Sequence, residues 1–198
     1  MGLSSDMKRE VKGLLPFASV FALYCLVTFP LLPLGDDWNY HTMPNVAFRW
    51  ANLLPRGAVW RPLDILFGGF LGLAPGMFPW VNRLAVAAGH TLGGFFLCRV
   101  LQRFYGLSRG KTLLPAAFFL FASGGFTAVA SVDGLNQVYA STFGIMAFDR
   151  YLVSRGTGRR IQYALFVALC FLAALSKENG LVWFAVIPFL AAFGCAAA

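Results

Sequence analysis

Two adjacent acids, Asp36 and Asp37, follow the first long apolar segment of the chain in the run GDDWNYH. Acidic side chains at a membrane boundary are costly unless they face water, a cation or a substrate. One carboxylate of such a pair can accept the proton of an attacking hydroxyl group, while the other binds a metal ion or orients a donor. His41 follows closely and can join this site. The competing interpretations are a solvated helix end for the acids and a surface residue for His41.

Two cations with phosphate-binding chemistry lie in other parts of the chain. Arg61 opens an Arg-Pro-Leu sequence, and its guanidinium group has the forked geometry that matches a phosphate. At a membrane surface an arginine also commonly contacts lipid headgroups. Lys177 precedes Glu178 where a later apolar segment ends. Here the competing interpretation is a helix C-terminus, which Lys177 stabilises through the helix dipole and which Gly180 terminates.

Further polar residues interrupt the apolar segments. Asp133 lies in an Asp-Gly pair between two of them, where turn chemistry accounts for it, and it is a supporting candidate for the same site. His90 lies deep within an apolar segment, and a hydrogen bond to another helix is the interpretation we favour over a functional role. Gly89 and Gly93 form a GxxxG pair on that segment, which predicts close packing of helices.

The composition favours a membrane protein. Hydrophobic residues make up 59% of the 198-residue chain and charged residues 12%, whereas soluble domains carry about a quarter charged residues. This excludes disorder, a disulfide scaffold and an ordinary soluble enzyme. The net charge of +8 does not predict nucleic-acid binding, because the cations lie between apolar segments rather than on one wet surface.

The apolar segments predict an all-α polytopic transmembrane protein of about six spans that forms a single transmembrane domain over residues 1–198. The expected spans are 13–35, 78–102, 112–132, 135–149, 161–176 and 181–198. The connection after the first span should hold an interfacial helix at 46–54 and a short juxtamembrane or re-entrant helix at 63–73. Since the chain ends within or beside an apolar span, we expect it to be the N-terminal part of a longer protein.

The distribution of Lys and Arg predicts the orientation. With the N-terminus in the cytosol, most of these cations fall on the cytosolic side, as the positive-inside rule requires. The first loop, the connection with Asp133 and the Lys177–Glu178 pair then lie on the outer side. We therefore expect a multi-pass protein of the bacterial inner membrane with its candidate site outside the cytosol.

Three short motifs, in this order, resemble the membrane-embedded GT-C glycosyltransferases. This superfamily includes protein O-mannosyltransferases, lipid A aminoarabinose transferases and TPR-bearing mannosyltransferases. The motifs are an acidic pair that opens the first outer loop, an Arg-Pro-Leu followed by an Asn near the next span, and a Leu-Ser-Lys-Glu that closes a later span. In this chain they are Asp36-Asp37-Trp38, Arg61-Pro62-Leu63 with Asn82, and Leu175-Ser176-Lys177-Glu178.

The resemblance implies transfer of a sugar from a polyprenyl-phosphate donor to an acceptor on the non-cytosolic face. By position, Asp36 or Asp37 becomes the catalytic acid, and Arg61 and Lys177 become the donor-phosphate ligands, with His41, Asp133 and Glu178 in support. Members of the superfamily have roughly twice as many spans, so this part alone need not be active. No organic cofactor is implied, and the residues leave open whether a divalent cation takes part, which acceptor is used and which sugar is carried.

Two other functions compete with glycosyl transfer. A transporter or lipid-flippase segment predicts broken spans with charged side chains that face a cavity at the middle of the membrane. A membrane assembly subunit without catalysis predicts no particular arrangement of the outer acids. The charged residues are expected to cluster at one membrane surface, with only His90 deep in a span, which favours the transferase.

Overall fold

The computed structural model describes residues 5–31, 54, 61–63, 65–66, 80–131 and 134–194. All regular elements in these residues are helices, which confirms the all-α fold class. They are α1 (Ser5–Thr28), α6 (Trp80–Tyr105), α7 (Arg109–Phe121), α8 (Ser123–Ala130), α9 (Leu135–Thr157), α10 (Arg160–Ser176), the 3-10 turn η4 (Glu178–Leu181) and α11 (Val182–Gly194). The expected helix at 46–54 and most of the one at 63–73 lie outside the described residues.

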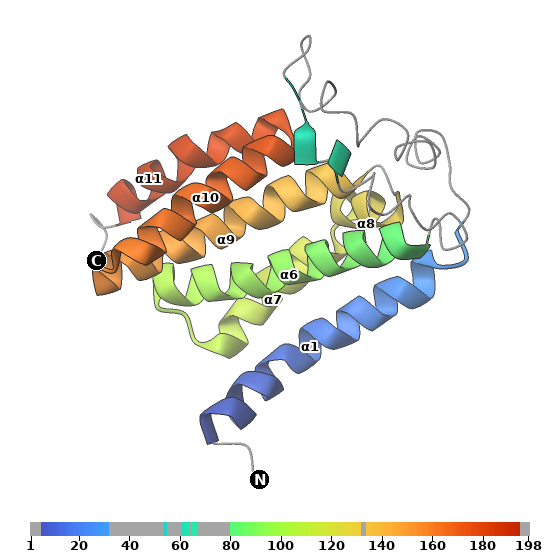
Figure 1. The fold of residues 1–198 in the computed structure, drawn as a ribbon. Coiled ribbons are helices and arrows are strands. Elements are labelled where there is room, and N and C mark those ends of the chain that lie inside the picture. The colour runs from blue at the N-terminus through green and yellow to red at the C-terminus, as the bar shows by residue number, and fades with distance from the viewer. Residues whose placement is uncertain are drawn as a thin grey trace.

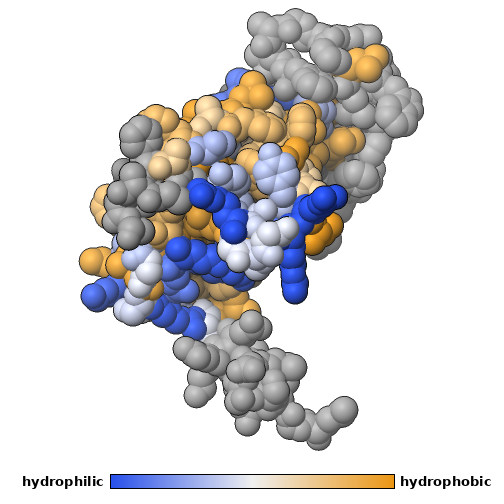
Figure 2. Space-filling view, turned by 90° about the vertical axis from the view of Figure 1, so that its left-hand side faces the viewer, coloured by the Kyte–Doolittle hydropathy of each residue, from blue (hydrophilic) through white to orange (hydrophobic). Residues whose placement is uncertain are grey.

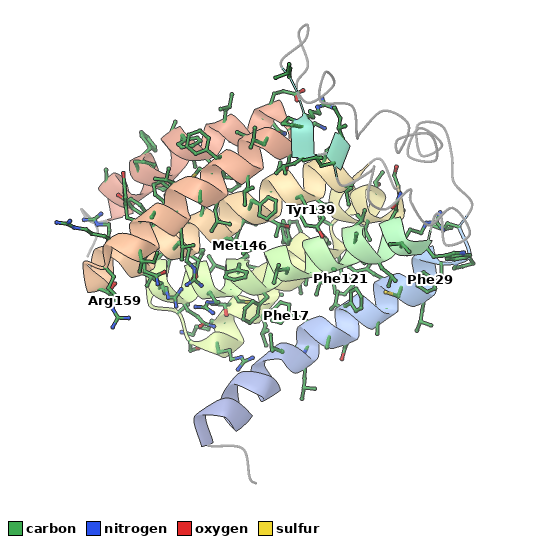
Figure 3. The ribbon with its side chains drawn as sticks, viewed as in Figure 1. Phe17, Phe29, Phe121, Tyr139, Met146 and Arg159 are labelled. Atoms are coloured by element: carbon green, nitrogen blue, oxygen red, sulfur yellow. The ribbon has the colours of Figure 1, made fainter. Side chains whose placement is uncertain are left out.

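The helices form one bundle in which the chain runs back and forth between two ends (Figure 1). α1, the α7–α8 pair and α10 run one way, and α6, α9 and α11 return. We call the end with Arg61, Arg83 and Glu178 the loop end. The basic end is the opposite one, and its cations are Arg99, Arg103, Arg109, Lys111, Arg150, Arg155, Arg159 and Arg160. Figure 3 shows Phe29 at the loop end and Arg159 at the basic end.

Small residues allow α6 and α9 to pack closely at the centre of the bundle. A Cβ atom added at Gly89 would lie 3.0 Å from Val138, and one added at Gly93 would lie 3.0 Å from the Thr142 hydroxyl oxygen. This hydroxyl donates a 2.8 Å hydrogen bond to the carbonyl oxygen of Gly89. The glycine pair therefore packs one helix against another, as the sequence predicted.

The expected third span is divided into two helices. The backbone of Ala122 is extended (φ −59°, ψ 144°), and it separates α7 from α8. A Cβ atom at Gly125 would lie 2.9 Å from the Phe119 carbonyl oxygen, so only glycine fits this bend. The bend is closed by His90, whose Nε2 lies 3.2 Å from the Leu120 carbonyl oxygen. His90 thus makes the helix-to-helix hydrogen bond expected from its depth.

The helix of the expected fourth span is longer than that span. The span was expected over 135–149, and α9 continues to Thr157. Gly158 ends the helix in the left-handed conformation (φ 65°), which glycine adopts without steric cost. Asp149 can lie inside a helix because arginines of α6 and α9 surround its carboxylate.

Large apolar side chains cover much of the outer surface of the bundle. Leu26, Leu114 and Phe118 are each at least three-quarters exposed. By length and composition, Trp80–Tyr105 is long and apolar enough to cross a membrane. The apolar helices Gly13–Thr28, Arg160–Ser176 and Glu178–Leu190 are shorter.

Candidate functional site

The loop end is built around the turn that follows α10. The helix ends at Ser176, and Lys177 takes an extended conformation (φ −158°, ψ 145°) before the 3-10 turn η4. The turn folds back onto α10 so closely that a Cβ atom at Gly180 would collide with the Ala173 carbonyl group. Gly180 is therefore required for close backbone approach. Gly180 follows the end of α10, and its φ is not positive.

Glu178 binds Arg61 across 117 residues of sequence. The Arg61 Nε donates to Oε2 of Glu178 at 2.7 Å, and Nη2 donates to Oε1 at 2.6 Å. This two-point geometry is the strongest form of an arginine–carboxylate contact. The hydrogen bonds from Arg61 lower the pKa of Glu178 to about 2, so the carboxylate is ionised at neutral pH. The contact ties the Arg-Pro-Leu segment to the end of α10.

The structure brings together the predicted residues that it describes. Arg61, Lys177 and Glu178 all lie at the loop end. Part of the Arg61 guanidinium is engaged by Glu178, a pairing that the sequence did not reveal. The other four predicted residues, Asp36, Asp37, His41 and Asp133, lie outside the described residues. In the part of the chain that the structure describes, no group of three His, Cys, Asp or Glu side chains could hold a metal ion.

A pocket of about 430 Å³ lies beside this ion pair. It is lined by Ala140 and Ser141 of α9, by Glu178 and Asn179 of the turn, and by Val182 and Trp183. Asn179 also donates a 3.2 Å hydrogen bond to Gln137. An aromatic ring beside amide, hydroxyl and carboxylate groups can bind a small polar molecule through one apolar face and several hydrogen bonds.

Trp183 was not singled out by the sequence. Its indole ring packs against Gly144 of α9, where any Cβ atom would overlap the ring. Gly144 and Trp183 are far apart in sequence, and both belong to apolar helices. Their contact is therefore visible only in the packing of the folded chain. The sequence feature that could have drawn attention to Trp183 is its position shortly after the Lys177-Glu178-Asn179 turn.

Two buried polar residues lie at the start of α6. Arg83 is fully buried and donates a 2.5 Å hydrogen bond to the carbonyl oxygen of Thr28, at the end of α1. Asn82 is also buried, and its amide atoms have no hydrogen-bond partner in the described parts of the chain. A buried amide without a partner is unusual and costly. Asn82 therefore offers a donor and an acceptor at this end of α6.

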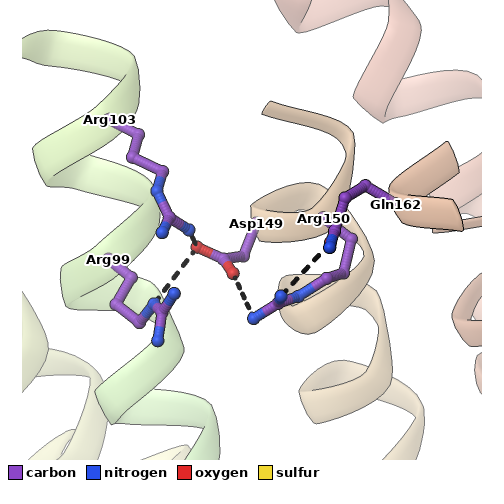
Figure 4. A network of polar contacts seen from close by, with 5 residues as sticks. All are labelled: Arg99, Arg103, Asp149, Arg150 and Gln162. Carbon is purple, nitrogen blue, oxygen red and sulfur yellow. Dashed lines mark hydrogen bonds and ion pairs between the residues drawn. The ribbon is translucent and has the colours of Figure 1, made fainter. Parts of the chain in front are cut away.

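A second charged cluster lies at the basic end (Figure 4). Asp149 is fully buried, and its carboxylate contacts Arg103, Arg99 at 3.4 Å and Arg150 at 3.0 Å. Arg150 also donates a 3.3 Å hydrogen bond to Gln162 of α10. The cluster thus joins α6, α9 and α10. The sequence feature that could have indicated this cluster is an acidic residue, Asp149, next to Arg150 after a long apolar run.

Comparison with known proteins does not identify a relative. A scan against protein-family models finds no match, and searches of curated proteins and of solved structures find no similar protein.

Proposed function

We propose that this chain is a membrane glycosyltransferase unit that transfers a sugar from a polyprenyl-phosphate donor at its loop end. The observation that carries this proposal is the contact between Arg61 and Glu178. It joins two of the three short motifs, which are separated by 117 residues, at one end of the bundle. Asn82, from the same group of motifs, is buried at the start of α6, where the adjacent Arg83 is bound to the end of α1.

The membrane placement is supported by the surface and by the charges. Exposed leucine and phenylalanine side chains cover the helices between the two ends, a surface that needs an apolar surrounding. The described cations gather mainly at the basic end, as expected for the cytosolic side. We propose about six spans with the N-terminus in the cytosol, an arrangement that the alternating directions of the helices support.

The chemistry requires cations near the phosphate and a base near the sugar. In this proposal Lys177 binds the donor phosphate together with Arg61, and Glu178 holds the Arg61 guanidinium in place. The cations stabilise the charge that develops on the departing phosphate. Asp36 or Asp37 accepts the proton of the attacking hydroxyl group. The pocket beside Trp183 is suited to a sugar, whose apolar face can stack on the indole ring.

The described charges favour transfer over transport. A transporter predicts charged groups around a cavity at the middle of the membrane. Within the described residues the charged side chains lie toward one end or the other of each helix, and His90, in the middle of α6, is engaged in a helix-to-helix hydrogen bond.

The test is a transfer assay with membranes that contain the protein. Labelled glucose, mannose and aminoarabinose donors on polyprenyl phosphate are offered in turn, and incorporation into membrane acceptors is measured. Asp36→Asn or Asp37→Asn should lower the rate about 100-fold, because the change removes a base and preserves its shape. Lys177→Ala should raise the apparent KM for the donor, whereas Lys111→Ala at the basic end should not. Unchanged transfer in the Asp36→Asn, Asp37→Asn and Lys177→Ala variants contradicts the proposal.

A further inference from the structure

A second pocket, of about 690 Å³, lies at the basic end between α1, α6 and α7. Its polar wall contains Arg99, Gln102 and Arg103 of α6 and Arg109 at the start of α7. Figure 2 views this end of the bundle, where hydrophilic side chains gather with hydrophobic ones around them. None of these residues belongs to the proposed transfer site, which lies at the opposite end.

The pocket carries an excess of positive charge. Arg99 and Arg103 share the single carboxylate of Asp149 with Arg150. Side chains of Arg99 and Arg103 keep about a third of their surface exposed, at 33% and 35%. Arg109 adds another positive charge and makes no ion pair with any described residue. The cluster therefore complements an anion at the mouth of the pocket.

The remaining lining of the pocket is mainly apolar, and Phe95 lies directly beside Arg99. The apolar wall is formed by Leu14 and Phe17 of α1, Phe95 of α6 and Leu113 of α7. Leu14 is 46% exposed, so this wall reaches the surface of the bundle. A ligand that fills the pocket therefore needs an anionic group and an adjoining apolar chain.

The Arg109 side chain extends to α1. Its guanidinium lies against the backbone of Gly13, so closely that a Cβ atom at Gly13 would overlap it. The start of α1, the start of α7 and the second half of α6 thus meet around one cationic group. The glycine makes the close approach of the two helices and the arginine possible.

We infer that this pocket binds an anionic phospholipid, with its phosphate on the arginines and an acyl chain along the wall of Leu14 and Phe17. Basic pockets between membrane helices on the cytosolic side are suited to anionic headgroups. This inference rests on the membrane placement in the proposed function and is independent of sugar transfer. A free phosphate ion would satisfy the arginines and leave the apolar wall unused.

The test is lipid retention by the purified full chain, measured by native mass spectrometry during titration with phosphatidylglycerol or phosphatidylcholine. Arg109→Gln removes one charge from the pocket, and Lys111→Gln removes one from the same turn of α7 outside it. Binding of phosphatidylglycerol should weaken about fivefold in Arg109→Gln, because this is the change in affinity that the loss of one cation near an anionic lipid produces. It should stay unchanged in Lys111→Gln. An equal loss in both variants, or equal retention of the two lipids, overturns the inference.

Two further measurements keep the outcome clear. Leu14→Asp introduces a repelling carboxylate into the pocket, whereas Leu15→Asp places it on the neighbouring surface, so only the former should lower retention. Inorganic phosphate at the lipid concentration should not displace the lipid, and displacement would identify a phosphate site only. A chain absent from the membrane fraction refutes the membrane placement and with it the proposed function. A membrane-bound chain that does not prefer phosphatidylglycerol refutes this inference alone.

Discussion

Arg61 and Glu178 hold each other by two hydrogen bonds of 2.7 and 2.6 Å at the loop end of the bundle. One residue belongs to the segment between the first two long helices, and the other begins the turn after α10. The pair fixes the approach of these segments to one another. It also sets the orientation of the guanidinium group that the proposed function places near the donor phosphate.

Exchanging the two charges should test this contact. Arg61→Glu or Glu178→Arg alone places like charges together, and the double exchange restores an attraction. Both side chains are partly exposed, so the coupling energy should be about 0.5–1 kcal/mol. Thermal unfolding of the single and double variants in detergent measures it. If the loss of stability in the double variant equals the sum of the losses in the two single variants, the pair is not formed.

The same pair should produce a pH dependence at low pH. Glu178 has a pKa of about 2 in the folded chain and 4.5 as its ordinary value. A depressed folded pKa stabilises the fold above the ordinary pKa, and this stabilisation is lost as the pH falls toward the folded value. The difference in unfolding temperature between the protein and Glu178→Gln should be constant from pH 7 to about 5 and shrink below 4.5. A difference that stays constant down to pH 2.5 would contradict the assigned pKa.

Asp149→Asn should destabilise the bundle strongly. The change removes the carboxylate that Arg99, Arg103 and Arg150 share, and it leaves these cations close together without compensation. Removal of one partner from a buried ion pair costs about 3–5 kcal/mol, and the partial exposure of the arginines places the expectation near the lower value. Unfolding titrations in denaturing detergent measure the change.

The matched control is Arg159→Gln, in the turn that follows the same helix. Arg159 is exposed and outside the Asp149 cluster, so its replacement should change the stability by less than about 0.5 kcal/mol. Similar effects of the two substitutions would mean that the cluster does not stabilise the junction of α6, α9 and α10.

Gly144→Ala should displace Trp183. The added methyl group would overlap the indole ring, and overpacking of this kind costs about 1–3 kcal/mol. Gly156→Ala, further along α9, meets nothing within 4 Å and should stabilise the helix by about 0.5–1 kcal/mol. Thermal unfolding of both variants gives the comparison. Combination of Gly144→Ala with Trp183→Leu should recover part of the loss, and no recovery would show that the two residues are not in contact.

The two ends of the bundle should lie on opposite sides of the membrane. Single cysteines at Asn39 and at Gly156, in a background without the native cysteines, report the two sides. A membrane-impermeant maleimide should label the cysteine at position 39 in intact cells and the one at 156 only after permeabilisation. The reverse pattern would invert the topology and place the candidate transfer site in the cytosol.

The sequence determined the helical class and most helix positions, because long apolar segments bounded by charged or turn residues form helices in any arrangement. The expected segment 161–176 agrees with α10 within one residue. The GxxxG pair and His90 were assigned their packing roles correctly, since residue type and depth restrict what each can do. The grouping of Arg61, Lys177 and Glu178 at one end also followed from the alternation of the apolar segments.

Only the tertiary structure decided which charged groups meet. The partner of Glu178 is 117 residues away, and the arginines around Asp149 come partly from another helix, so no local pattern indicates either contact. The fourth span was expected to end at 149, whereas α9 continues to Thr157, and the buried Asp149 is tolerated inside the helix because α6 supplies cations to it. The sequence specifies a helix through the residues along it, whereas an ion pair depends on how two helices are placed against each other, and packing alone sets that.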